Sequence, residues 1–355
     1  MSFRAVALLC LIYAAFPTSL QAQTDPVDRA INNYILPNAE RFVGLAELLS
    51  ADVSALCEMP GQESLRTAKA SFRSALLGYM RIDILRIGPM NTGNLRERFL
   101  FWPDRRSTGL KQVQRLIAKA DGSATDPATL SEKSVAVQGF LALEFLLFGT
   151  GSDVLYSSPS GYRCKYASAA ARNIANMAGT FRAAWQSQTG FQKSWREPGP
   201  NNDLFQNDNE ALGELFGVTA NAFEAIRDQR LLPIAPKGEK TRPPKRAFMW
   251  RSNMTQPTLK ASFAALQDFI NHSGMLQNLP KDQAWIQDSV ALEFKNANAA
   301  ANRLDGPILT LVSEPTSASQ LSYLVVLMSA LNTLIGEDAT TALNLPRTFS
   351  PLDGD

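Results

Sequence analysis

Residues 137–149 read Val-Gln-Gly-Phe-Leu-Ala-Leu-Glu-Phe-Leu-Leu-Phe-Gly. This apolar run is long enough for more than two helical turns, and its only charged side chain is Glu144. An ionised glutamate is rarely buried without a partner, because its removal from water costs several kcal/mol. Three explanations are therefore open. Glu144 lies on the solvated edge of an amphipathic helix, pairs with an arginine of a neighbouring helix, or belongs to a functional site.

The glycines and the glutamate of this run resemble the signature helix of the imelysin family. The family motif reads Gly-x-His-x-x-Glu and continues into an apolar stretch that ends in glycine, as Gly139, Glu144 and Gly149 do here. The family comprises periplasmic helical proteins, first described as metallopeptidases and often linked to iron uptake. Its histidine and glutamate share one helix face and can hold a metal ion. Leu141 occupies the histidine position and supplies no lone pair, so the resemblance implies half a metal site.

Length and charge set broad limits on the chain. Its 355 residues, 45% of them hydrophobic, can bury one large core or two ordinary ones, and we expect two. The net charge is +2, from 35 basic and 33 acidic residues. This balance gives no reason to expect a nucleic-acid or anionic-membrane partner.

The N-terminus has the pattern of a signal peptide. Arg4 precedes an apolar core at residues 5–16, and Leu-Gln-Ala at 20–22 is a cleavage site before Gln23. No later segment has about 18 uninterrupted apolar residues. The sequence thus predicts a soluble periplasmic protein with no transmembrane segment in the mature chain.

Removal of the signal peptide leaves two cysteines, Cys57 and Cys164. An even count in an exported chain predicts a disulfide, with two buried free thiols as the alternative. Their spacing does not fit a zinc site, and a single histidine, His272, excludes a His-rich metal centre. We expect His272 to be exposed at a helix end.

Helical periodicity extends through most of the mature chain, without the sustained alternation of strands. The expected helices cover residues 28–56, 63–87, 110–120, 131–148, 162–188, 209–232, 255–270, 283–303 and 317–335. A Gly/Ser/Asp/Pro-rich segment at 150–161 marks a domain boundary, and the basic, proline-rich segment 233–246 is an exposed connector. The predicted fold is all-α, with two up-and-down helical bundles. The predicted division is signal peptide 1–22, first bundle with the signature helix 23–152, second bundle 153–345 and C-terminal tail 346–355.

Three further patches extend the resemblance: Arg-Ile-Gly-Pro at 86–89, Phe-Trp-Pro-Asp at 101–104 and Trp-Arg-Ser at 250–252. In imelysin-like proteins such segments pack over or face the signature helix. The alternative is that Trp102 covers the bundle core while Asp104 and the arginines form surface pairs. The implied ligand-binding cleft comprises Gly139, Leu141, Glu144, Arg86, Arg98, Trp102, Asp104, Arg105, Trp250, Arg251 and Ser252.

Three functions are compatible with these patterns. The favoured one is a non-catalytic binding or accessory protein for iron acquisition, with periplasmic or membrane iron-uptake components as partners. The second is a metallopeptidase, which normally needs about three protein ligands to its metal. The third is an interaction module in which Glu144 and arginines form an internal salt-bridge network. No cofactor is firmly expected; Glu144 would be a weak ligand for iron or zinc, and Leu141→His should restore binding if the rest of the site is kept.

Overall fold

The computed structural model describes residues 25–157, 161–238 and 240–346. Within these ranges the chain forms helices and no strand, apart from an isolated bridge between Lys237 and Lys240. The all-α prediction is confirmed. The expected signal peptide and residues 347–355 of the expected tail lie outside the described residues.

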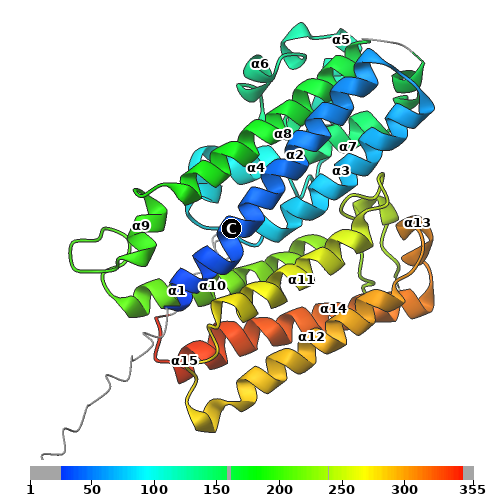
Figure 1. Cartoon of the computed structure of the whole chain (residues 1–355). Coiled ribbons are helices and arrows are strands. Elements are labelled where there is room, and N and C mark those ends of the chain that lie inside the picture. Colours follow the sequence, from blue (N-terminus) through cyan, green and yellow to red (C-terminus); the bar gives the residue numbers. More distant parts are fainter. Residues whose placement is uncertain (1–24, 158–160, 239, 347–355) are drawn as a thin grey trace, which may run out of the picture.

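The long helices lie in two groups, one above the other in Figure 1. The first group comprises α2 (Leu36–Glu58), α3 (Gln62–Ile82), α7 (Phe140–Phe148) and α8 (Tyr162–Gln186). The second comprises α10 (Asp208–Ile226), α11 (Thr255–Ser273), α12 (Trp285–Arg303) and α14 (Pro315–Thr333). The shorter elements are α1 (Pro26–Arg29), η1 (Ala30–Ile35), η2 (Gly88–Asn94), α4 (Leu95–Phe99), α5 (Thr108–Lys119), η3 (Gly122–Ala124), α6 (Pro127–Ser131), η4 (Val135–Val137), η5 (Ser152–Tyr156), α9 (Phe191–Arg196), η6 (Arg227–Leu231), η7 (Pro244–Arg246), η8 (Lys281–Gln283), α13 (Ile308–Leu311), η9 (Leu334–Ala339) and α15 (Thr340–Ala342).

Helix α8 belongs to the first group, although the sequence suggested a boundary before it. It packs along α2 and contacts α7. Small residues make this close packing feasible, since Ala170 and Ala171 are fully buried. In the structure the chain therefore passes to the second group after α9, and the boundary expected at residues 152–153 falls inside the first.

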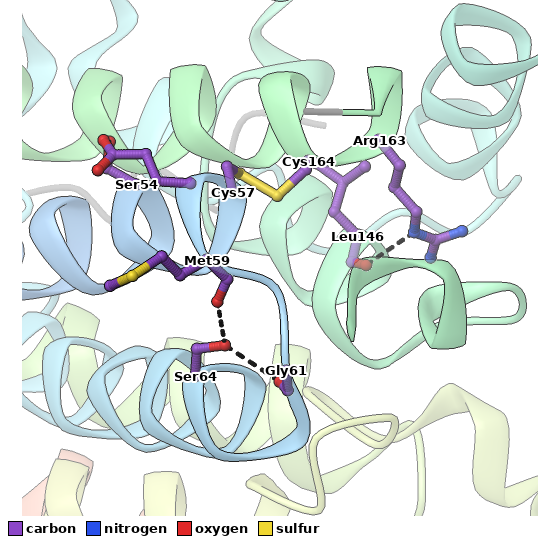
Figure 2. The surroundings of a disulfide bond; sticks show 9 residues. Ser54, Cys57, Met59, Gly61, Ser64, Leu146, Arg163 and Cys164 are labelled. Carbon is purple, nitrogen blue, oxygen red and sulfur yellow. Dashed lines mark hydrogen bonds between the residues drawn. A yellow bond between two sulfur atoms is a disulfide. The ribbon is translucent and has the colours of Figure 1, made fainter. Parts of the chain in front are cut away.

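The predicted disulfide is present and ties α8 to α2. Figure 2 shows Cys57, near the end of α2, bonded to Cys164, near the start of α8. The two Cα atoms are 5.5 Å apart. The neighbouring Arg163 donates a hydrogen bond from Nε to the Leu146 carbonyl at 2.8 Å (Figure 2). Its Nη2 donates to the Phe145 carbonyl at 2.6 Å. These carbonyls lie in the last turn of α7, where helical carbonyls lack partners within the helix, and the Phe145 carbonyl also accepts the N–H of the capping Gly149 at 2.9 Å. The start of α8 thus holds both α2 and the signature helix.

The signature helix is shorter than predicted, since it begins at Phe140 rather than residue 131. Ser131 instead ends the separate helix α6, which Asp126 caps. Directly before α7, the backbone at Gly139 crosses close to the backbone of α4. A Cβ on Gly139 would lie 2.1 Å from the Phe99 carbonyl oxygen. Glycine is required at this crossing because any side chain would collide with the backbone of α4.

Helix α3 also ends early, at Ile82 rather than residue 87. The next residue, Asp83, is buried and forms an ion pair with Arg230 of η6 in the second group. Gly88 follows with φ of +49°, a left-handed conformation that suits glycine. A contact between the two groups therefore lies directly after the end of α3.

One helix among the described residues is long and apolar enough to cross a membrane by length and composition alone. It spans Pro315–Ala342, and 33% of its most apolar window is buried. Its first part, α14, packs against α10 and α12. Helix α14 is therefore packed against the second group on part of its surface, and most of its apolar window is half-buried or exposed.

Candidate functional site

A pocket of about 90 Å³ lies beside α7. Leu141 and Glu144, three residues apart, share one face of this helix and both line the pocket. The opposite walls come from α5, from the segment before it and from the segment before α11. The lining residues are Phe101, Trp102, Asp104, Ser107, Gly109, Leu110, Val113, Ala136, Leu141, Ala142, Glu144, Phe145, Lys245, Ala247, Met249, Trp250 and Arg251.

Glu144 is buried and has two neighbours that bind its carboxylate. Its Oε1 accepts hydrogen bonds from the Ser252 backbone N–H at 3.0 Å and from Ser252 Oγ at 2.8 Å. Arg251 Nη1 lies 3.8 Å from Oε2. Burial raises the pKa of Glu144, and this effect outweighs the Ser252 hydrogen bonds and the Arg251 charge, which lower it. Glu144 is only 1% exposed, and the segment before α11 holds its carboxylate in place.

A tight turn presents Ser252 to Glu144. Met249 and Asn253 have φ angles of +53° and +58°, and the Met254 N–H donates to the Met249 carbonyl at 3.0 Å. Thr255 Oγ1 donates to the Phe248 carbonyl at 2.6 Å. The turn leaves the Ser252 N–H free of other backbone partners, so it points to the carboxylate.

Two cations contact the indole of Trp250. The guanidinium carbon of Arg251 lies 4.5 Å from the ring centroid, and Lys245 Nζ lies 5.6 Å from it. Arg251 also lies 5.6 Å from the ring centroid of Phe145. Burial lowers the pKa of Arg251, opposed by Glu144. One side of the pocket is therefore cationic and aromatic.

Trp102 and Asp104 line the pocket and also hold the surrounding structure. Trp102 Nε1 donates to the Gln229 carbonyl at 2.8 Å, across the two helix groups. Asp104 caps α5: Oδ1 accepts from the Thr108 N–H at 2.7 Å, and Oδ2 accepts from the Gly109 N–H at 2.9 Å. Leu110 N–H adds a longer bond of 3.3 Å to Oδ2. The Asp104 carboxylate is thus committed to the helix N-terminus.

Several predicted cleft residues lie away from this pocket. Arg98 donates from Nε to Gln138 Oε1 at 3.0 Å and lines a separate, more open pocket. Arg105 is exposed and is not part of the lining. Gly139 forms the close crossing at the start of α7. Ser252 reaches the pocket only through Glu144.

Arg86 belongs to a buried ionic cluster that the sequence did not reveal. At its centre Asp83 pairs with Arg230, whose Nη1 also donates to Ser262 Oγ at 2.6 Å. Arg86 Nη2 donates to Gln229 Oε1 at 3.3 Å, and burial lowers the pKa of Arg86 to about 10, opposed by Asp83. Burial alone would raise the pKa of Asp83, but the arginines Arg230, Arg86 and Arg96 bring it below its usual value.

These residues do not fit a transition-metal centre. Among the described residues no group of three or more His, Cys, Asp or Glu side chains is placed to hold a metal ion. Leu141 has no donor atom, and Glu144 and Asp104 are engaged by Ser252, Arg251 and the start of α5. His272 is exposed on α11, where its Nδ1 lies 2.7 Å from the Asp268 carbonyl oxygen. A metal needs more free ligands than this pocket offers.

Comparisons with known proteins agree on the family and the fold. The sequence model of the family described as Imelysin matches residues 35–335. An imelysin-like protein from Psychrobacter arcticum 273-4 has a similar structure, with a TM-score of 0.74, 15% identity, and coverage of 91% of this chain and 96% of that chain. A candidate iron-regulated protein A precursor from Parabacteroides distasonis ATCC 8503 is also similar, with a TM-score of 0.69 and 11% identity. That match covers 87% of this chain and 94% of the other chain. None of the curated proteins compared with the chain matches it.

Proposed function

This chain belongs to the imelysin family, and we propose that it is an exported, non-catalytic binding or accessory protein that takes part in iron acquisition. Its binding site is the pocket beside Glu144. Residues 1–22 are the signal peptide that directs export, and periplasmic or membrane components of iron uptake are its partners. The resemblance to imelysin-like proteins and the description of one structural neighbour as an iron-regulated protein support the link to iron.

The contacts of the Glu144 carboxylate with Ser252 and Arg251 support a binding role over a metallopeptidase role. A peptidase metal activates water from a site with about three protein ligands and an open position. Here the ligand position of the motif holds Leu141, and Glu144 accepts two hydrogen bonds from Ser252. Arg251, 3.8 Å from the second oxygen, places a positive charge where a metal would have to bind. Each of these contacts lowers the affinity for a cation.

A purely structural role is the second candidate, because a specific observation favours it. The Asp83–Arg230 pair joins the two helix groups with side chains only 7% and 4% exposed. A buried ion pair of this kind fixes how two bundles pack together. It is separate from the pocket, however, and leaves the pocket's own polar residues without an explanation.

Two measurements test the proposal. Calorimetric titration of the mature protein, purified without a histidine tag, should show no sub-micromolar binding of ferrous iron or zinc. Deletion of the gene should slow growth in iron-depleted medium but not in iron-replete medium, and the wild-type gene should restore growth. Tight metal binding would overturn the proposed non-catalytic role. Equal growth of the deletion strain and the wild type in iron-depleted medium would overturn the link to iron.

A further inference from the structure

The pocket beside Glu144 offers more free hydrogen-bond donors than free acceptors, and we propose that it binds a short monocarboxylate. The carboxylate lies between Arg251 and Lys245, and the hydrocarbon chain packs against the apolar wall that Leu141 completes. This inference rests on the proposed function, because it names the class of ligand for the same pocket.

Of the two carboxylates that line the pocket, Asp104 is engaged through both oxygens and Glu144 through one. Both oxygens of Asp104 accept backbone N–H groups at the start of α5. Glu144 Oε1 accepts two hydrogen bonds from Ser252, and Oε2 faces Arg251. A ligand that donates hydrogen bonds would therefore compete with protein groups already in place.

The cationic donors of the pocket have fewer hydrogen-bond partners. Within the described part of the chain, Arg251 has one ionic partner, Glu144, at 3.8 Å, which is beyond hydrogen-bond distance. Lys245 has no ion pair or hydrogen bond to any described residue, and it lies at the exposed edge of the pocket. Both cations contact the ring of Trp250. An anion placed at this ring would bind two charges that the protein leaves incompletely paired.

Hydrogen-bond capacity, and not net charge, favours an anion here. The four charged lining residues, Asp104, Glu144, Lys245 and Arg251, have a formal sum of zero. The two acids accept hydrogen bonds from nearby donors, whereas Lys245 has no such partner among the described residues and Arg251 has only the Glu144 contact at 3.8 Å. Guanidinium and ammonium groups bind ionised acceptors by shorter and stronger hydrogen bonds than neutral carbonyl groups.

The size and lining of the pocket restrict the ligand to a few carbon atoms. Its volume of about 90 Å³ is below the roughly 150 Å³ of an engineered cavity that admits benzene. Leu110, Val113 and Leu141 supply apolar surface inside it. At the position where the family motif has a metal-binding histidine, Leu141 therefore supplies apolar surface that packs against a hydrocarbon chain.

Three probes of equal chain length test the proposal: butyrate, butyramide and butylamine. Each is titrated into the mature wild-type protein, with binding followed by ligand-observed NMR. Butyrate should bind, butyramide at least about tenfold more weakly, and butylamine not at all. Acetate should bind more weakly than butyrate, by about fourfold for each methylene group removed. Inorganic phosphate should not displace butyrate; displacement at equal concentration would make this a general anion site and overturn the proposal.

Matched lysine variants then locate the site. Lys245→Gln should weaken butyrate binding by about tenfold. Lys237→Gln removes the same charge from the same connector outside the pocket and should keep wild-type affinity. Stronger binding of butylamine or butyramide than of butyrate, no binding of any probe by folded protein, or equal effects of the two lysine variants would overturn the inference. The proposed function would stand or fall separately, on the metal titration and the iron-limited growth.

Discussion

Ser252 donates two hydrogen bonds to one oxygen of Glu144, from its backbone N–H at 3.0 Å and from its hydroxyl at 2.8 Å. The two residues are 108 positions apart in the chain. Their contact brings the segment before α11 against the signature helix, and so encloses one side of the pocket. Glu144 therefore contributes both to the site and to the packing of the two helix groups.

Ser252→Ala should destabilise the protein by about 1.5–3 kcal/mol, the usual contribution of a hydrogen bond to a charged group. The variant removes one of the two bonds and leaves a buried carboxylate less well solvated. Ser54→Ala is the matched control, since Ser54 Oγ donates to Glu58 Oε1 at 3.3 Å on the exposed surface. It should change the free energy of unfolding by less than about 0.5 kcal/mol. Similar effects of both substitutions in urea unfolding would contradict a special role for Ser252.

Glu144 should make stability depend on pH in a definite direction. Because burial raises its pKa in the folded protein, the folded state holds this proton more tightly than the unfolded chain does. The resulting stabilisation is complete below the ordinary pKa of 4.5 and is lost as pH rises through the raised value. Glu144→Gln lacks this titration but keeps a carbonyl acceptor for Ser252.

Urea unfolding of wild type and Glu144→Gln at several pH values between about 4 and 8 tests this sign. The stability of wild type relative to the variant should fall as pH rises. A constant difference across the range would show that the pKa of Glu144 is not raised, and an increasing difference would show that it is lowered.

Breaking the Asp83–Arg230 pair should cost more stability than breaking an exposed pair. Asp83→Asn leaves Arg230 buried without a counter-charge, at a cost of about 3–5 kcal/mol. Glu40→Gln disrupts the cross-helix pair with Arg182, whose side chains are 61% and 34% exposed, and should cost less than about 1 kcal/mol. Equal losses of stability in the two variants would contradict the importance of burial.

A double variant separates the charge effect from packing at this position. Asp83→Leu combined with Arg230→Met removes both charges of the pair and should recover part of the stability that Asp83→Asn loses, because buried Arg86 still lacks the Asp83 charge. No recovery in chemical unfolding would mean that the hydrogen bonds of Arg230 to its other neighbours, including Ser262, account for the effect.

Local patterns predicted the helices and the disulfide better than they predicted the site. Periodicity located the long helices, because one apolar face recurs at helical spacing in each. The sequence placed the end of α3 too late, and the buried Asp83–Arg230 pair that follows the helix joins residues 147 positions apart, so it has no local signal. The sequence left three explanations for Glu144 open, since its partner Ser252 is also distant in sequence.

Motif resemblance identified the segments around the pocket but not the role of each residue. It pointed to Leu141, Glu144, Trp102, Asp104, Trp250 and Arg251, all of which line the pocket. It also pointed to Arg86 and Arg98, which the fold directs elsewhere. Lys245 was missed because a lysine in a proline-rich basic connector has no local feature that distinguishes it from solvated neighbours.

The last prediction concerns Leu141→His. From sequence alone this substitution was expected to restore a metal site if the rest of that site were kept, because the introduced imidazole and Glu144 would share one helix face. The structure changes the expected result: Ser252 occupies Oε1, and Arg251 lies 3.8 Å from Oε2. Two ligands also fall short of the three that catalytic zinc sites usually have.

We therefore expect Leu141→His alone to bind ferrous iron and zinc no tighter than micromolar in calorimetric titration. Leu141→His combined with Arg251→Ser removes the competing charge and should bind zinc at least about tenfold more tightly than the single variant. Arg251→Ser without the histidine is the control and should gain little, because it adds no imidazole. Sub-micromolar binding by Leu141→His alone would show that Arg251 and Ser252 yield readily to a metal. Equal binding by the single and double variants would show that a shortage of ligands, and not the arginine, keeps the metal out.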